Sequence, residues 1–133
     1  MKSRPRTMAI ALVLFTLMIS SAIIVSAQRG TSVVSRISFA RGRTTAVLTG
    51  TVHRGMSHDY LLKARGGQNM SVHLSARGGV SFVILTPTGD SLADYAKDWS
   101  GDLPRSGDYR INVLPDSSTE RTMSYTLEVT VRN

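Results

Sequence analysis

The sequence predicts an all-β protein: an antiparallel, jelly-roll-like β-sandwich of about seven to eight strands, preceded by an N-terminal signal helix. Three observations predict this fold. Beyond the first 27 residues, apolar and polar residues alternate with the two-residue period of a half-buried strand. Glycine- and proline-containing turns separate these segments about every 8–12 residues, the spacing of small sandwiches and barrels. No stretch of ten residues there repeats its apolar positions with a helical period, which argues against a helical domain.

Residues 1–27 have the pattern of a secretory signal peptide. Three basic residues precede the apolar segment Met8–Val25, and Val25-Ser26-Ala27 places small residues where a signal peptidase cleaves. The alternative is an uncleaved membrane anchor, since the apolar segment is just long enough to span a bilayer. Three hydroxyl residues within it, and the cleavage site that follows, favour cleavage. We therefore expect a periplasmic or secreted protein that meets the membrane only through this segment, before it is removed.

The exported remainder is predicted to be a flexible leader at 28–35 followed by one β-sandwich domain at 36–133, because it is too short for two domains. The sequence contains 16 Lys and Arg and 9 Asp and Glu. Removing the three basic residues of the signal peptide leaves 13 against 9, a net charge of +4. Export separates this charge from chromosomal DNA, and no aromatic residues interleave it, so we expect no nucleic-acid partner.

The predicted strands follow one another along the whole exported chain. They are Arg36–Ala40, Thr45–His53, Asp59–Ala64, Asn69–Ala76, Val80–Leu85, Asp108–Leu114 and Ser124–Val131. Their in-phase apolar residues should be buried together between two layers: Tyr60, Leu62, Val72, Leu74, Ile111, Val113, Leu127 and Val129. The sequence has no cysteine, so apolar burial must hold the layers together without disulfides.

If successive strands run up and down, the arginines near the strand ends fall into two groups. Arg41, Arg43 and Arg65 are predicted at one end of the sandwich, and Arg54 and Arg77 at the other. Neither group is dense, and solvated charges that keep turns soluble are the favoured interpretation.

Residues capable of catalysis are present but do not form a recognisable pattern. His53, His58 and His73 lack metal-ligand spacing, and no serine lies in a Gly-x-Ser-x-Gly motif. The absence of cysteine excludes thiolate metal sites and cysteine nucleophiles. We therefore expect a protein that is not an enzyme, with no catalytic residues, no metal and no cofactor.

The segment from Trp99 to Tyr109 concentrates an aromatic residue, a proline turn and a Gly-Asp entry into an alternating strand. It has two interpretations. Tyr109 can pack at a sandwich corner with its hydroxyl bonded to nearby backbone, while Trp99 closes the core. Alternatively the segment is a presented loop, with Arg105 and Ser106 contacting a partner and Trp99 offering a stacking face.

Two segments carry a resemblance to known proteins. They are Asp59-Tyr60-Leu61-Leu62-Lys63-Ala64-Arg65-Gly66-Gly67-Gln68-Asn69-Met70-Ser71-Val72, and the later run Trp99-x-Gly-x-Leu-Pro-x-Ser-Gly-Asp-Tyr-x-Ile-x-Val. Their order and spacing resemble the periplasmic inhibitors of g-type (goose-type) lysozyme, over roughly Phe39 to Val131. More distantly, the chain is similar to the bacterial pre-peptidase C-terminal domain, a jelly-roll sandwich of secreted enzymes.

The resemblance implies a monomeric β-sandwich that blocks the peptidoglycan-cleaving cleft of a g-type lysozyme by inserting loops into it. Ser106-Gly107-Asp108-Tyr109 matches a loop motif of lysozyme inhibitors, and the implied contact residues are Ser106, Gly107, Tyr109, Arg110 and Arg121. Alternation with Tyr109 and Ile111 should leave Arg110 facing solvent, free to contact a partner. The chain departs from the family at 115–122, which is shorter than the family's arginine-rich segment and contains one arginine. The alternative implied by the pre-peptidase likeness is a module that binds carbohydrate or envelope polysaccharide, with Trp99 as a stacking platform.

Overall fold

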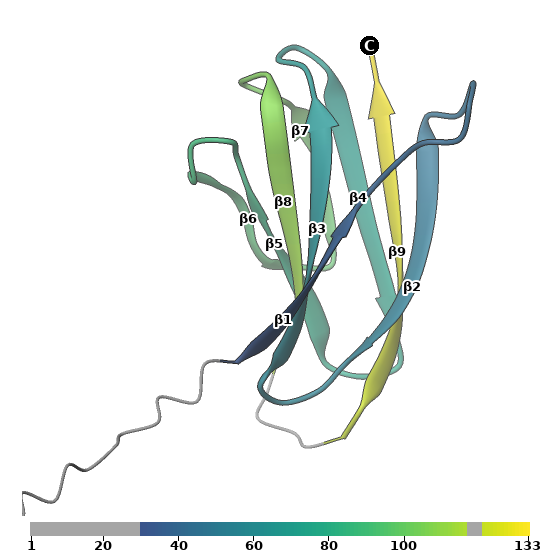
Figure 1. Cartoon of the computed structure of the whole chain (residues 1–133), viewed down its shortest axis with the longest axis vertical. Coiled ribbons are helices and arrows are strands. Elements are labelled where there is room, and N and C mark those ends of the chain that lie inside the picture. The colour runs from purple at the N-terminus through teal and green to yellow at the C-terminus, as the bar shows by residue number, and fades with distance from the viewer. Residues whose placement is uncertain (1–29, 117–120) are drawn as a thin grey trace, which may run out of the picture.

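The computed structural model describes residues 30–116 and 121–133. Within these ranges the chain forms nine strands and two sheets (Figure 1). The strands are β1 (Thr31–Arg36), β2 (Thr45–Val52), β3 (Met56–Ala64), β4 (Asn69–Ala76), β5 (Val80–Leu85), β6 (Ser91–Ala96), β7 (Asp98–Asp102), β8 (Gly107–Pro115) and β9 (Met123–Arg132). The predicted signal peptide lies outside the described residues. No helix in the described part is long and apolar enough to cross a membrane.

The two sheets confirm the predicted all-β sandwich. One has the order β1-β3-β8-β5-β6 and the other β2-β9-β4-β7. All strand pairs are antiparallel except β1 with β3, which run parallel. Consecutive strands such as β3 and β4 lie in different sheets, so the chain repeatedly crosses from one layer to the other.

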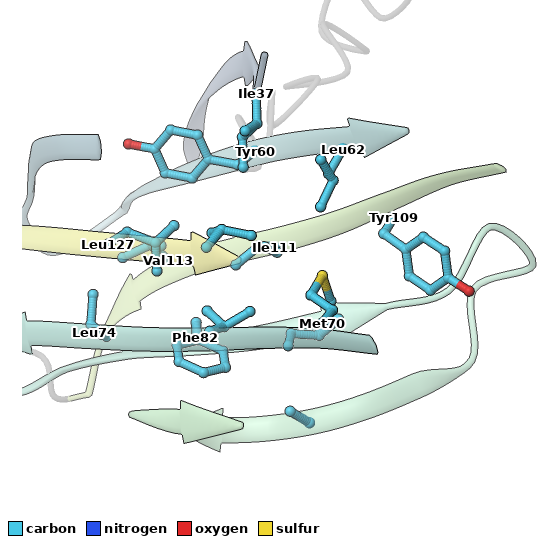
Figure 2. Packing of buried hydrophobic residues seen from close by; sticks show 14 of the residues in the cluster. Ile37, Tyr60, Leu62, Met70, Leu74, Phe82, Tyr109, Ile111, Val113 and Leu127 are labelled. Atoms are coloured by element: carbon cyan, nitrogen blue, oxygen red, sulfur yellow. The ribbon is translucent and has the colours of Figure 1, made fainter. Parts of the chain in front are cut away.

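The core lies between the layers, as the alternation predicts. All eight side chains expected there are buried, with at most 4 % of their surface exposed. Along β9 the inward residues Tyr125, Leu127, Val129 and Val131 are buried while their neighbours are not. Figure 2 shows Leu127 of β9 pointing into the space between the layers that also holds Phe82 and Met70. Apolar burial on this scale stabilises a cysteine-free domain, at about 25 cal/mol per Å² of apolar surface removed from water.

The N-terminal part of the domain differs from the prediction. We expected a flexible leader up to residue 35 and a strand at Arg36–Ala40, but the strand is Thr31–Arg36 and it ends where the predicted one begins. Most of its side chains are exposed, so hydrophobic alternation does not reveal it. Backbone hydrogen bonds to β3 hold it instead, continued by Thr31 N–H to Gly55 O (2.8 Å) and Ile37 N–H to Leu61 O (2.8 Å).

Two further strands, β6 and β7, lie in a region where no strand was predicted. Both are edge strands, and most of their side chains are exposed or half-buried. Their sequence therefore lacks the alternation of a strand that faces the core on one side. With β6 and β7, residues 30–116 and 121–133 contain nine strands rather than seven to eight.

Strand direction sorts the loops between two ends. We call one of them the corner end; it is formed by the C-terminal residue and by loops 37–44, 65–68, 86–90 and 103–106. We call the other the opposite end; it is formed by loops 53–55 and 77–79 and by Arg121–Thr122. In Figure 1 the C-terminus lies at the corner end, beside the start of β2. The predicted sorting of the arginines is confirmed: Arg41, Arg43 and Arg65 lie at the corner end, and Arg54 and Arg77 at the opposite end.

Candidate functional site

Tyr109 forms a corner between the core and loop 103–106. Its side chain is fully buried, and its hydroxyl donates to Arg105 O (2.6 Å) and accepts from Arg105 N–H (3.1 Å). Figure 2 shows its ring at one end of the core with the hydroxyl turned toward the loop. This is the structural interpretation of Tyr109, and it leaves no side-chain surface for a partner. Tyr109 therefore positions the loop rather than contacting another molecule.

Ser106 joins this loop to the neighbouring turn at 65–68. Its Oγ accepts a hydrogen bond from Gly66 N–H (2.9 Å), while Gly67 N–H donates to Leu103 O (2.8 Å) and Leu103 N–H to Gln68 O (2.7 Å). The turn and the loop are thus one hydrogen-bonded unit, with Ser106 exposed on it.

Gly107 is held from the other side by turn 86–90. Its φ is 142°, a region that side-chain-bearing residues rarely adopt, and an added Cβ would lie 2.9 Å from both Cβ and Cγ of Pro87. Only glycine allows the chain to pass this close to the proline. The Ser106-Gly107 pair therefore sits in a narrow, conformationally fixed position at the corner end.

Arg110 points outward from β8, as predicted, but it is not free. Its side chain is 49 % exposed, and Nη1 lies 3.4 Å from Oδ2 of Asp59. Asp59 is buried and also accepts hydrogen bonds from Ser32 Oγ (2.9 Å) and Asn112 Nδ2 (2.5 Å). The buried carboxylate tethers Arg110 beside a hollow of about 360 Å³, whose lining includes Pro87 and Asp108. Arg110 and the Ser106-Gly107 pair therefore lie on neighbouring parts of the corner end.

Arg121 lies away from these residues. It precedes β9 at the opposite end, where it lines a hollow with Arg77 and Gly78. The nine residues of β8 separate the two ends, a span of about 26 Å at 3.3 Å per residue. The structure thus brings together Ser106, Gly107 and Arg110 but not Arg121.

Trp99 is neither fully buried nor presented. It lies on edge strand β7 opposite Val72, so it shares the inner face of the sheet and packs against the core. Its ring also covers Gly101, where an added Cβ would lie 2.9 Å from the indole. Of the two interpretations, closing the core at its edge describes Trp99 better than offering an open stacking face.

Two of the three histidines, His58 and His73, have separate environments. His73 Nδ1 bonds Asp98 Oδ1 on the exposed outer face of the second sheet. No group of three metal-ligating side chains occurs among residues 30–116 and 121–133.

His58 instead joins a polar network between the sheets at the opposite end. Its Nδ1 lies 2.9 Å from the Tyr125 hydroxyl and 3.2 Å from that of Tyr60, and its Nε2 lies 2.9 Å from Ser35 Oγ. The two tyrosine hydroxyls are 2.7 Å apart. Burial lowers the pKa of His58, against a smaller opposing effect of the Asp59 charge, and burial raises the pKa of Tyr60 and Tyr125. These hydrogen bonds connect His58 and Tyr60 of β3 to Tyr125 of β9, so the network joins the two sheets and is not a surface binding site.

The sequence did not predict one cluster of positively charged side chains. Arg43, Lys63, Arg65 and Arg132 line a single hollow at the corner end. Sorting the arginines identified Arg43 and Arg65, but Lys63 and Arg132 lie at strand ends whose approach depends on the pairing of β3 and β9 with their neighbours.

Comparison with solved structures supports the fold. No protein-family model matches the sequence, and no curated protein sequence matches it. The structure is similar to Aeromonas hydrophila PliG, a periplasmic lysozyme inhibitor of g-type lysozyme, at a TM-score of 0.70 and 24% identity over 76% of this chain and 97% of that one. Salmonella Typhimurium PliG, of the same description, gives 0.66 and 21% over 77% and 100%. The pre-peptidase C-terminal domain of Bacillus anthracis collagenase gives 0.51 and 11% over 77% and 95%. The two likenesses inferred from sequence motifs are thus confirmed at the level of the fold.

Proposed function

We propose that this protein is a periplasmic or secreted inhibitor of g-type lysozyme that binds through its corner end. The observation that carries the proposal is the likeness of nearly the whole sandwich to the PliG inhibitors, which cover 76% and 77% of this chain. The Ser106-Gly107-Asp108-Tyr109 motif lies in a loop that Tyr109, turn 65–68 and Pro87 hold in place. A loop that is already ordered loses little conformational entropy on binding.

In this proposal the exposed groups of the corner end enter the lysozyme cleft and exclude the glycan. Ser106 and Arg105 are exposed beside Gly107, and Arg110 lies on the adjoining face of β8. A guanidinium donates paired hydrogen bonds to a carboxylate, the group a lysozyme uses for catalysis. Arg110 would exchange its 3.4 Å contact with Asp59 for such a contact, while Asp59 keeps its bonds to Ser32 and Asn112.

Arg121 belongs to a separate contact in this proposal. Its distance from the corner end means that it contributes only if the lysozyme also reaches the opposite end of the sandwich. Two substitutions therefore test two surfaces independently.

The test is lysis of peptidoglycan by a g-type lysozyme in the presence of the exported protein. We expect slower lysis at micromolar protein, weakened by Arg110→Ala at the corner end. Weakening by Arg121→Ala as well would show that the lysozyme also reaches the opposite end. Lys97→Ala removes one positive charge from an exposed residue between β6 and β7, away from the corner end, and should leave inhibition unchanged. Absence of inhibition by the folded wild-type protein would overturn the proposal and leave the fold unaffected.

The second candidate function is a module that binds envelope polysaccharide. It is favoured by the likeness to the pre-peptidase domain and by a hollow of about 360 Å³ on the outer face of the second sheet, which is lined by Ser71, Ser100 and Thr130. This function requires retention on insoluble peptidoglycan that Ser100→Leu, which fills the hollow with an apolar side chain, abolishes without unfolding the protein. Retention that survives the substitution contradicts it.

A further inference from the structure

Four cationic side chains converge on one hollow at the corner end. Arg43 comes from loop 37–44, Lys63 from β3, Arg65 from turn 65–68 and Arg132 from the end of β9. The hollow measures about 290 Å³, and Phe39 and Val131 supply its apolar part. Segments distant in sequence thus bring four positive charges to one concave surface.

These charges are not neutralised within the hollow. No Asp or Glu side chain of the described residues lines it. Asp108, on the strand beside Lys63, is engaged by Arg36 through two contacts of 3.0 Å. The hydrogen bond from Arg36 is the main cause that lowers the pKa of Asp108, and the charge of Lys63 contributes less. Even if Asn133 adds a terminal carboxylate, the four cations leave an excess of three positive charges.

Hydrogen-bond donors in the hollow already point at a common acceptor. Arg65 Nη2 and Gln68 Nε2 donate to the same atom, Asn133 Oδ1, at 2.8 and 3.0 Å. The turn that carries both donors is closed by Arg65 N–H to Gln68 Oε1 (2.8 Å) and by Gln68 N–H to Arg65 O (3.2 Å). An anionic oxygen replacing the amide oxygen would find these donors in place.

We propose that this hollow binds a phosphate-bearing anion. Near neutral pH a phosphate group carries up to two negative charges and several acceptor oxygens, which suits three guanidinium groups and one ammonium converging from different directions. The volume of the hollow accommodates a group the size of pyrophosphate, either as a free ion or as part of a phosphorylated envelope polymer. The proposal does not depend on lysozyme inhibition, because none of the lining residues is Ser106, Gly107, Arg110 or Arg121.

The test is calorimetric titration of the exported protein with inorganic pyrophosphate at low ionic strength. A double variant, Arg43→Gln with Arg132→Gln, removes two lining charges from exposed side chains and should weaken binding about ten-fold or more. The matched control, Arg41→Gln with Arg77→Gln, removes the same charge from exposed residues that do not line the hollow and should keep the wild-type affinity. Circular dichroism verifies that both variants are folded.

Each outcome decides the proposal. Absence of binding at millimolar pyrophosphate, or equal weakening in the two double variants, overturns it, because the second result is a response to net charge alone. Selective loss in the hollow variant supports it. A parallel titration with a phosphate-bearing polysaccharide separates the sources: binding of both ligands supports an envelope polymer, and binding of pyrophosphate alone supports a small free anion.

Discussion

Replacing Tyr109 by Phe removes one oxygen atom from the centre of the corner. The ring remains buried, so the apolar packing is preserved, and the change isolates the hydroxyl and its two bonds to Arg105. A net hydrogen bond contributes about 0.5–1.5 kcal/mol, so the two together are expected to contribute about 1–3 kcal/mol to the free energy of unfolding. For a domain of this size that corresponds to a melting temperature lower by about 4 to 12 °C.

Urea unfolding followed by tryptophan fluorescence measures this free energy, because Trp99 lies near the core. Tyr95→Phe is the matched control: it removes the same atom from a side chain that is 68% exposed, and its effect on stability should be within about 0.5 kcal/mol of zero. In the inhibition assay Tyr109→Phe should also weaken lysozyme binding while the protein is still folded, because the loop is released. If Tyr109→Phe is as stable as the wild type, the hydroxyl does not hold loop 103–106 and the corner argument is wrong.

Three further predictions concern the elements around the corner and between the sheets. Gly107→Ala should destabilise the fold by about 1–3 kcal/mol in urea unfolding, because the backbone is strained for alanine and the methyl group meets Pro87; an unchanged midpoint contradicts this close approach. Asp59→Ala should cost about 2–4 kcal/mol by the same measurement, since it removes the acceptor shared by Arg110 and two other side chains, and a loss below 1 kcal/mol is incompatible with that role. The His58 pKa is lower in the folded than in the unfolded protein, so the unfolded state binds more protons between the folded-state pKa and about pH 6.5. The stabilising contribution of neutral His58 is therefore present above that pH and is lost as the pH falls through the folded-state pKa. Unfolding free energies between pH 8 and 5 should show this loss, and His58→Gln should reduce it; an identical pH profile in the variant contradicts the assignment.

Proposed lysozyme binding and proposed anion binding use neighbouring parts of one end of the molecule. Turn 65–68 belongs to both, because Gly66 N–H bonds Ser106 while Arg65 and Gln68 face the cationic hollow. An anion bound at the hollow would therefore alter the electrostatic field beside the lysozyme-binding loop. Comparing inhibition with and without pyrophosphate measures whether the two sites influence each other.

Local alternation was sufficient to predict the central strands. The inward faces of β3, β4, β8 and β9 can be predicted because every second side chain is apolar and is buried away from water. Three of the four edge strands of the two sheets, β1, β6 and β7, do not show this alternation. They are held in large part by backbone hydrogen bonds, which every residue except proline can donate, so the types of their side chains do little to predict a strand.

The candidate site shows the same division. The Ser-Gly-Asp-Tyr motif and the corner role of Tyr109 were recognisable from residue order, because a tyrosine in phase with buried positions needs a nearby partner for its hydroxyl. The tether from Asp59 to Arg110 was not, since it depends on the register that places Asp59 opposite Asn112. The separation of Arg121 from Ser106 likewise follows from the length of β8.

By itself, the sequence determined the layered β architecture, the buried face of each central strand and the division of the arginines between the two ends. These properties follow from the period of side chains along a strand and from the reversal of direction at each turn. Only the tertiary structure decided which charges share a hollow, which arginine is tethered and which candidate residues meet. Those contacts join segments up to about 90 residues apart, such as Arg43 and Arg132, and they depend on strand order and register, which no local pattern encodes.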